Sequence, residues 1–176
     1  MASRNPIVDA GLRFLREVLK ASPQSRGRTA TRTRPRATLR TDTGYPGDFT
    51  GTPQIAYSPF NDDKADPGEV VWTWVPYEED HHQGKDRPVL IIGHDGRWLL
   101  ALQVTSQDHD LDAAQEARAG RYWEDIGTGA WDPQGRPSEV RVNRIIRIDP
   151  KKVRRIGAML DEDTFLRVAK VVRKHS

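Results

Sequence analysis

The sequence contains 176 residues, no cysteine, and 28 Lys and Arg against 25 Asp and Glu, which gives a formal net charge of +3. The lack of cysteine excludes disulfide bonds and thiolate chemistry, and it fits a reducing compartment such as the cytoplasm. Apolar runs are strand-sized, well below the ~18 residues that span a bilayer, and no secretory signal is visible. We therefore expect a cytoplasmic protein without a membrane partner, built as one ordinary domain plus extra segments.

Basic charge is concentrated near the N-terminus. Residues 1–41 carry ten Lys and Arg against two acids, a net charge of +8, whereas residues 42–176 carry 18 basic and 23 acidic residues, a net charge of −5. A basic segment is attracted to polyanions through counterion release, without preference for their sequence. The N-terminal part of the chain is therefore expected to raise affinity for nucleic acid nonspecifically.

The first 66 residues predict little packed structure. A short amphipathic helix is indicated within residues 1–21, over 7–20, by apolar residues at helical spacing: Val8, Leu12, Leu15 and Leu19. Residues 22–66 are rich in Arg, Thr, Ser, Pro, Gly and Asp and show almost no apolar periodicity, so we expect a mostly disordered linker with a local turn at 45–48. The helix and the Arg-rich stretch also match the composition of an organelle transit peptide.

Three strands are predicted after Gly68. Residues 69–75 alternate, with Trp72 and Trp74 on one face. A polar loop over 76–87 leads to residues 88–93, which are continuously apolar, as in a strand buried on both faces. Asp95 and Gly96 then form a strong hairpin signal. Residues 97–105 alternate between two faces, the first made of Trp98, Leu100, Leu102 and Val104 and the second of Leu99, Ala101, Gln103 and Thr105.

The C-terminal half predicts a short helix over 111–121, a turn-rich stretch over 127–138, a strand over 139–148 and a closing helix capped by Asp161. Arg144 falls on the apolar face of that strand, which indicates an edge, a bulge or an exit from the core. The apolar face consists of Val140, Val142, Ile146 and Ile148, with Ile145 opposite; the helix stripe consists of Phe165, Val168, Ala169 and Val172.

Short strands, Gly and Pro turns and one closing helix together define the expected fold class. It is mainly β, with a small SH3-like antiparallel barrel and a C-terminal helix over residues 67–176. A basic, largely disordered N-terminal extension precedes the barrel. A domain on the order of 100 residues is large enough for a modest core.

Four pieces of sequence follow one another in the region 68–174: GEVVWTWV at 68–75, GKDRPVLII at 84–92, VTS at 104–106, and SEVRVNRIIRI at 138–148 before the closing helix. Their order resembles the PemK/MazF family of toxin endoribonucleases of type II toxin–antitoxin systems. The resemblance implies sequence-selective cleavage of single-stranded RNA without a metal or other cofactor. It also implies a homodimer with an RNA groove at its interface, an antitoxin that occupies this groove, and operator DNA binding through the antitoxin complex.

The resemblance assigns catalysis to Arg87, Thr105 and Ser106. A guanidinium donates two parallel hydrogen bonds to phosphate oxygens, so Arg87 suits stabilisation of charge on a phosphorane. The two hydroxyls suit orientation of a phosphate oxygen or of the 2′-hydroxyl. The alternatives are a solvated arginine at a strand end and hydroxyls that bond to nearby backbone.

Other site residues are less sharply defined. Proton transfer has two candidates, His109 just past the Thr–Ser pair and Glu79 in the loop before Arg87. Seven cations within 141–155 indicate a phosphate-tracking surface or a solubility face. The RNA-binding candidates are Lys85, Gln103, Arg141, Asn143 and Arg147. No spacing of histidines and acids matches a zinc pattern, so we expect no metal site.

Two alternative functions stay open. The first is a catalytically inactive SH3-like module that binds nucleic acid or a protein partner, which the net charge of −5 over residues 42–176 favours. The second is a toxin of the same fold that acts on DNA gyrase. The combination of Arg87 with Thr105 and Ser106 favours catalysis over both.

Overall fold

The computed structural model describes residues 44–107 and 113–176, so the helix predicted over 7–20 and the candidate His109 lie outside the described residues. Among the described residues, neither α-helix has the length and apolar content of a membrane span. In chain order the elements are β1 (Glu69–Pro76), β2 (Gly84–Asp95), β3 (Trp98–Thr105), α2 (Ala113–Arg118), β4 (Trp123–Gly127), β5 (Ser138–Ile148), the 3₁₀-helix η2 (Pro150–Lys152), β6 (Arg155–Met159) and α3 (Glu162–His175).

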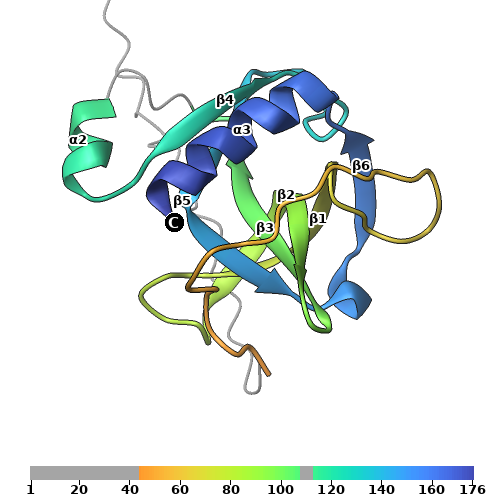
Figure 1. The fold of residues 1–176 in the computed structure, drawn as a ribbon, viewed down its shortest axis with the longest axis horizontal. Coiled ribbons are helices and arrows are strands. Elements are labelled where there is room, and N and C mark those ends of the chain that lie inside the picture. Colours follow the sequence, from red (N-terminus) through yellow and green to blue (C-terminus); the bar gives the residue numbers. More distant parts are fainter. Residues whose placement is uncertain (1–43, 108–112) are drawn as a thin grey trace, which may run out of the picture. The chain divides into compact units, whose positions relative to one another are not determined.

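The strands form one antiparallel sheet in the order β4-β5-β3-β2-β1-β6. The sheet curls into a half-barrel, and α3 lies across one of its faces (Figure 1). The predicted hairpin is present: Asp95 pairs with Trp98, and Gly96, in the two-residue loop between them, has a φ of +58° that glycine adopts without steric cost. These observations confirm the predicted mainly β, SH3-like fold with a C-terminal helix.

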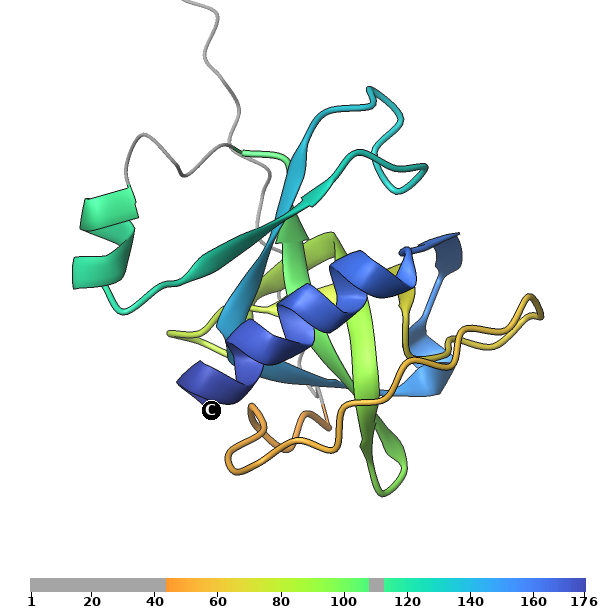
Figure 2. The ribbon, with the colours of Figure 1, turned by 45° about the horizontal axis from the view of Figure 1, so that its top comes forward.

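Alternation along the central strands builds an apolar cluster on each face of the sheet. Leu100, Leu102 and Val104 of β3 join the cluster under α3, while Leu99 and Ala101 join the opposite one, as predicted. Figure 2 shows α3 lying along the sheet on the first of these faces. The helix begins where predicted, because the Asp161 carboxylate accepts the Thr164 N–H at 2.9 Å, and its buried residues are Phe165, Val168, Ala169 and Val172.

A bulge in β5 corrects the predicted faces of that strand. The pairing of β5 with β3 shifts register between Leu102 and Val104. Ile145 therefore packs with Val140 in the cluster under α3, whereas Ile146 packs in the opposite cluster. The single apolar face predicted for residues 139–148 is wrong, because the bulge that Arg144 indicated reverses the alternation.

The prediction of a disordered linker over 22–66 is wrong for its last part, residues 44–66, which we call the strap; residues 22–43 lie outside the described residues. Phe49 forms a backbone bridge with Ile145, and Ile55 forms one with Gly93. The Tyr57 hydroxyl donates to the Leu160 carbonyl at 2.8 Å. These anchors occur singly in irregular backbone, so they leave no periodic signal in the sequence.

Charged contacts fix the first part of the strap. The Asp48 carboxylate accepts a 2.7 Å hydrogen bond from the Arg144 side chain. Arg147 donates to the Gly47 and Asp48 carbonyls at 3.0 and 2.9 Å. Both arginines lie on β5, so the strap is part of the folded unit.

Three further boundaries differ from the predictions. β2 begins at Gly84, so the end of the loop expected over 76–87 is strand. The helix expected over 111–121 is shorter, at Ala113–Arg118. β4 and β6 were not predicted, because each has five residues at a sheet edge and its conformation is set by the strand it pairs with.

Candidate active site

A pocket of about 580 Å³ contains the three residues predicted to be catalytic, Arg87, Thr105 and Ser106. Arg87 lies near the start of β2, and Thr105 ends β3. The pairing of β2 with β3 includes Val89 with Gln103, and Arg87 and Thr105 each lie two residues further along these two strands, on the side of the pocket. Two adjacent strands of the rigid sheet therefore hold the two side chains.

Arg87 has an unusual environment for an arginine in this protein. It is half-buried, and within the described part of the chain its side chain forms no hydrogen bond or ion pair. By contrast, Arg141 and Arg144 each bind a carboxylate at 2.7 Å. Burial lowers the pKa of Arg87, and the positive charge of Arg144 also lowers it. An arginine keeps its proton even so, and the pocket therefore contains a desolvated positive charge.

Lys85 adds a second cation to the same pocket. It lies two residues before Arg87 on β2, hence on the same face of the strand. Burial lowers the pKa of Lys85, and the neighbouring Arg87 lowers it further. Two like charges in a partly desolvated site favour binding of an anion between them.

The two hydroxyl groups differ in what they are free to do. Thr105 Oγ1 accepts the N–H of Gln107 at 3.2 Å, which leaves its own proton to donate. Ser106 Oγ lies 3.1 Å from Ser138 Oγ and also hydrogen-bonds to the Asp132 side chain. Thr105 is thus the better donor to a ligand, and Ser106 ties the end of β3 to the opposite wall of the pocket.

Asp132 is a pocket residue that the sequence did not reveal. Its side chain is 6% exposed and accepts Arg136 Nε at 2.7 Å, together with the backbone N–H groups of Gln134 and Arg136 at 3.1 and 3.2 Å. These bonds, with the Arg136 guanidinium first, hold the pKa of Asp132 well below its usual range. Asp132 therefore stays ionised and orders the loop rather than accepting a proton at neutral pH.

Trp131 anchors the same loop in the core. It is 3% exposed, and its Nε1 donates to Ser138 Oγ at 3.1 Å. A Cβ added to Gly129 would lie 2.1 Å from the Trp131 ring, so this close packing requires glycine. Loop anchoring, rather than stacking on a base, is the role that this buried position gives Trp131.

The other candidate residues lie outside this pocket. Glu79 is exposed in the β1–β2 connection. Arg141 binds Glu78, the Asn143 side chain bonds to the backbone of Tyr122 and Gly120, and Arg147 binds Asp95 and the strap. Gln103 is half-buried on β3, two residues before Thr105. Of the predicted RNA-binding residues, the structure thus brings only Lys85 into the pocket with Arg87.

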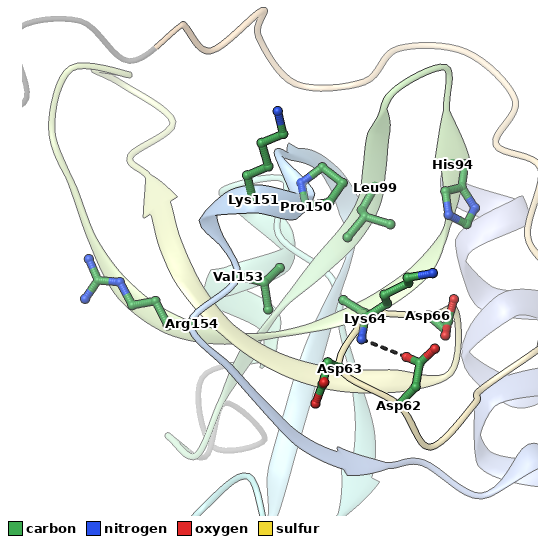
Figure 3. Close-up of a pocket in the computed structure, with 11 residues that line it drawn as sticks. Asp62, Asp63, Lys64, Asp66, His94, Leu99, Pro150, Lys151, Val153 and Arg154 are labelled. Carbon is green, nitrogen blue, oxygen red and sulfur yellow. Dashed lines mark hydrogen bonds between the residues drawn. The ribbon is translucent and has the colours of Figure 1, made fainter.

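A larger pocket of about 700 Å³ lies between residues 62–66 and the segment 150–154 (Figure 3). Leu99 and Val153 give it an apolar part. Its charged residues are balanced in sign: Asp62, Asp63 and Asp66 against Lys64, Lys151 and Arg154. Such a rim does not select an anion, and the pocket contains none of the predicted site residues. Among the described residues, no group of three or more His, Asp or Glu is placed to hold a metal ion.

The fold is a small antiparallel half-barrel, and the candidate pocket at β2 and β3 contains two cationic side chains, Lys85 and Arg87. Residues 66–175 match the family model described as PemK-like, MazF-like toxin of type II toxin–antitoxin system. The match covers more than half of the sequence, and the chain belongs to this family, which confirms the resemblance of residues 68–174.

The remaining comparisons add one structure. No curated protein matches the sequence. The chain is similar to a chain of the crystal structure of MazE–MazF (Form II) from Deinococcus radiodurans, with 19% sequence identity and a TM-score of 0.45. The similarity covers 64% of this chain and 96% of that one.

Proposed function

We propose that this protein is an endoribonuclease toxin that cleaves single-stranded RNA by attack of a 2′-hydroxyl on the adjacent phosphorus. The observation that carries the proposal is Arg87, a half-buried guanidinium without a counter-ion among the described residues, in one pocket with Lys85 and Thr105. A desolvated cation is costly unless an anion pairs with it. A phosphodiester is the anion that membership of this toxin family supports.

The proposed reaction assigns a role to each side chain of the pocket. The 2′-oxygen bonds to phosphorus and loses its proton, the bond to the 5′-oxygen breaks, and that oxygen gains a proton. Arg87 donates two parallel hydrogen bonds to the non-bridging oxygens, where negative charge develops. The Thr105 hydroxyl donates a hydrogen bond to one of them and keeps its proton. Because arginine holds its proton far above neutral pH, Arg87 acts through its charge and not as an acid.

Two further parts of the mechanism are proposals of the same kind. The cleavage needs no metal, because Lys85 and Arg87 already supply positive charge where the phosphate binds. His109 is the proposed proton acceptor, since it follows Ser106 by three residues and imidazole has a suitable pKa. Glu79 is the weaker candidate, because it is exposed and outside the pocket.

We also propose that the protein forms a homodimer and is inhibited by a cognate antitoxin, which in turn couples it to operator DNA. Membership of a type II toxin–antitoxin family supports an antitoxin partner. The pocket supports the mode of inhibition, because a partner that covers Arg87 and Lys85 excludes RNA from these two cations. Carboxylates of the antitoxin would suit these cations as well as phosphate does.

The test is incubation of the full chain with long single-stranded RNA in the presence of a chelator. The proposal predicts fragments that end in a 2′,3′-cyclic phosphate and begin with a 5′-hydroxyl. The same RNA with 2′-O-methyl groups is the matched control and stays intact, because its 2′-oxygen cannot attack. RNA that is bound but uncut, with or without divalent metal, would instead support a catalytically inactive binding module.

A further inference from the structure

The pocket around Arg87 continues into a second hollow of about 460 Å³, lined by Trp72, Asp86, Pro133 and Arg154. Three of these residues, Trp72, Asp86 and Pro133, also line the Arg87 pocket. The two hollows therefore form one trough that leads from Arg87 and Lys85 to Trp72. A ligand held by Arg87 has room to extend into this second hollow.

The indole ring of Trp72 is held in a defined orientation. Trp72 lies on β1, where its backbone pairs with Pro88 of β2 and Arg155 of β6. Its Nε1 donates to the Trp131 carbonyl at 3.3 Å, so the ring's polar group is already satisfied by the anchored loop. Trp72 is half-buried and lines both hollows, so it contributes an aromatic side chain to the wall of the trough.

The rest of the hollow combines apolar and hydrogen-bonding surface. Pro133 is exposed and adds an apolar group. The Asp86 carboxylate and the Arg154 guanidinium form an ion pair at 2.5 Å, with side chains 41% and 56% exposed. An exposed ion pair contributes little to stability, so both partners are able to turn toward a ligand. The hollow thus offers an aromatic surface, an acceptor and a donor together.

We propose that this hollow is a nucleobase subsite, in which the base next to the cleaved phosphate stacks on Trp72. Asp86 and Arg154 then hydrogen-bond to the edge of that base. The inference rests on the proposed function, because it requires a nucleotide whose phosphate is bound by Arg87 and Lys85. Proteins read single-stranded RNA in this way, by stacking bases on aromatic rings and bonding to their exposed edges.

The experiment measures binding of the full chain to a 2′-O-methyl oligonucleotide that contains one cleavage sequence and cannot be cut. Trp72→Leu weakens binding by about 5- to 150-fold, the range expected for loss of one stacked base. Trp72→Phe keeps an aromatic face and retains most of the affinity. Trp98→Leu is the matched control, because Trp98 is also half-buried but lies at the opposite end of β3 from Thr105; its affinity stays within about twofold of wild type, since it touches no part of the trough.

A scan with abasic residues separates stacking from a structural role of Trp72. Each base of the oligonucleotide is replaced in turn by an abasic residue. At one position the replacement weakens binding to the wild-type chain and to Trp72→Phe but not to Trp72→Leu. The same abasic profile in all three proteins, or wild-type affinity of Trp72→Leu, overturns the subsite while RNA cleavage by the wild type leaves the proposed function intact. A wild-type chain that neither binds nor cleaves RNA overturns both.

Discussion

Replacing Asp48 by alanine tests whether the strap is part of the folded unit. Asp48 is the carboxylate partner of Arg144, which it binds at 2.7 and 3.3 Å. The Arg144 side chain is 5% exposed and the Asp48 side chain 24%. In Asp48→Ala, Arg144 keeps its 3.0 Å bond to the Pro76 carbonyl but loses its counter-charge.

The expected loss of stability follows from this burial. Removal of one partner of a buried ion pair costs about 3–5 kcal/mol, because the other charge is left buried. Since Asp48 is partly exposed and water can enter its place, we expect about 3 kcal/mol, a large part of a typical total of about 5–15 kcal/mol. For a folded unit of this size the midpoint of thermal unfolding falls by about 6–12 °C.

The assay is urea unfolding of the full chain, followed by circular dichroism, with a second ion pair as control. Glu124→Ala breaks the Arg167–Glu124 pair at 3.1 Å, whose side chains are 50% and 23% exposed, and costs about 0–1 kcal/mol. Asp48→Ala with Arg144→Met recovers most of the loss, because no buried charge remains. A loss for Asp48→Ala no larger than that for Glu124→Ala would refute the reasoning.

Three other predictions concern the pocket, the closing helix and the N-terminus. Inorganic phosphate raises the unfolding midpoint of the wild type but not of Arg87→Ala, because only the wild type keeps the full anion site; equal shifts in both proteins would contradict that site. Asp161→Ala lowers the urea midpoint at pH 7, because the mutant lacks the carboxylate that accepts the Thr164 N–H. This hydrogen bond lowers the pKa of Asp161, so the stability that the carboxylate contributes is lost, and the difference between mutant and wild type shrinks, as pH falls below about 3.8. A difference that does not change with pH would argue against the charged cap. Removal of residues 1–43 reduces the salt dependence of RNA binding, since ten cations are lost, and an unchanged slope would exclude a role for them.

Periodicity predicted the central part of the fold well. β3 buries alternate apolar residues on both faces of the sheet, and α3 buries one stripe, as with Phe165 and Val168; such regular sets are visible in sequence. The strap and the edge strands were not predictable in this way. Their conformation depends on partners that are distant in the sequence. Asp48 binds Arg144, which is 96 positions away, and Tyr57 binds Leu160, which is 103 positions away.

The candidate site was predicted in part for a similar reason. The motifs put Arg87 and Thr105 on two successive strands, and these strands pair with each other, so both side chains line one pocket. Asp132 and Trp72 line the same pocket because the loop after β4 contacts β1, where Trp72 Nε1 donates to the Trp131 carbonyl, and no sequence motif indicates this contact. Charge favours RNA binding by Arg141 and Arg147, but in the structure these side chains bind carboxylates, Glu78 and Asp95 respectively. These partners lie elsewhere in the chain, so the sequence does not indicate the pairing.

The most direct test of the central claim is the single-turnover rate of RNA cleavage by Arg87→Ala. We expect a rate about 10²–10³-fold below that of the wild type, the usual effect of removing one preorganised donor from a developing oxyanion. Arg97→Ala is the control, because Arg97 is exposed and lies over the Trp98 ring, 4.6 Å from its centroid and outside the pocket; it cleaves at the wild-type rate. A folded Arg87→Ala that cleaves as fast as Arg97→Ala would contradict the account.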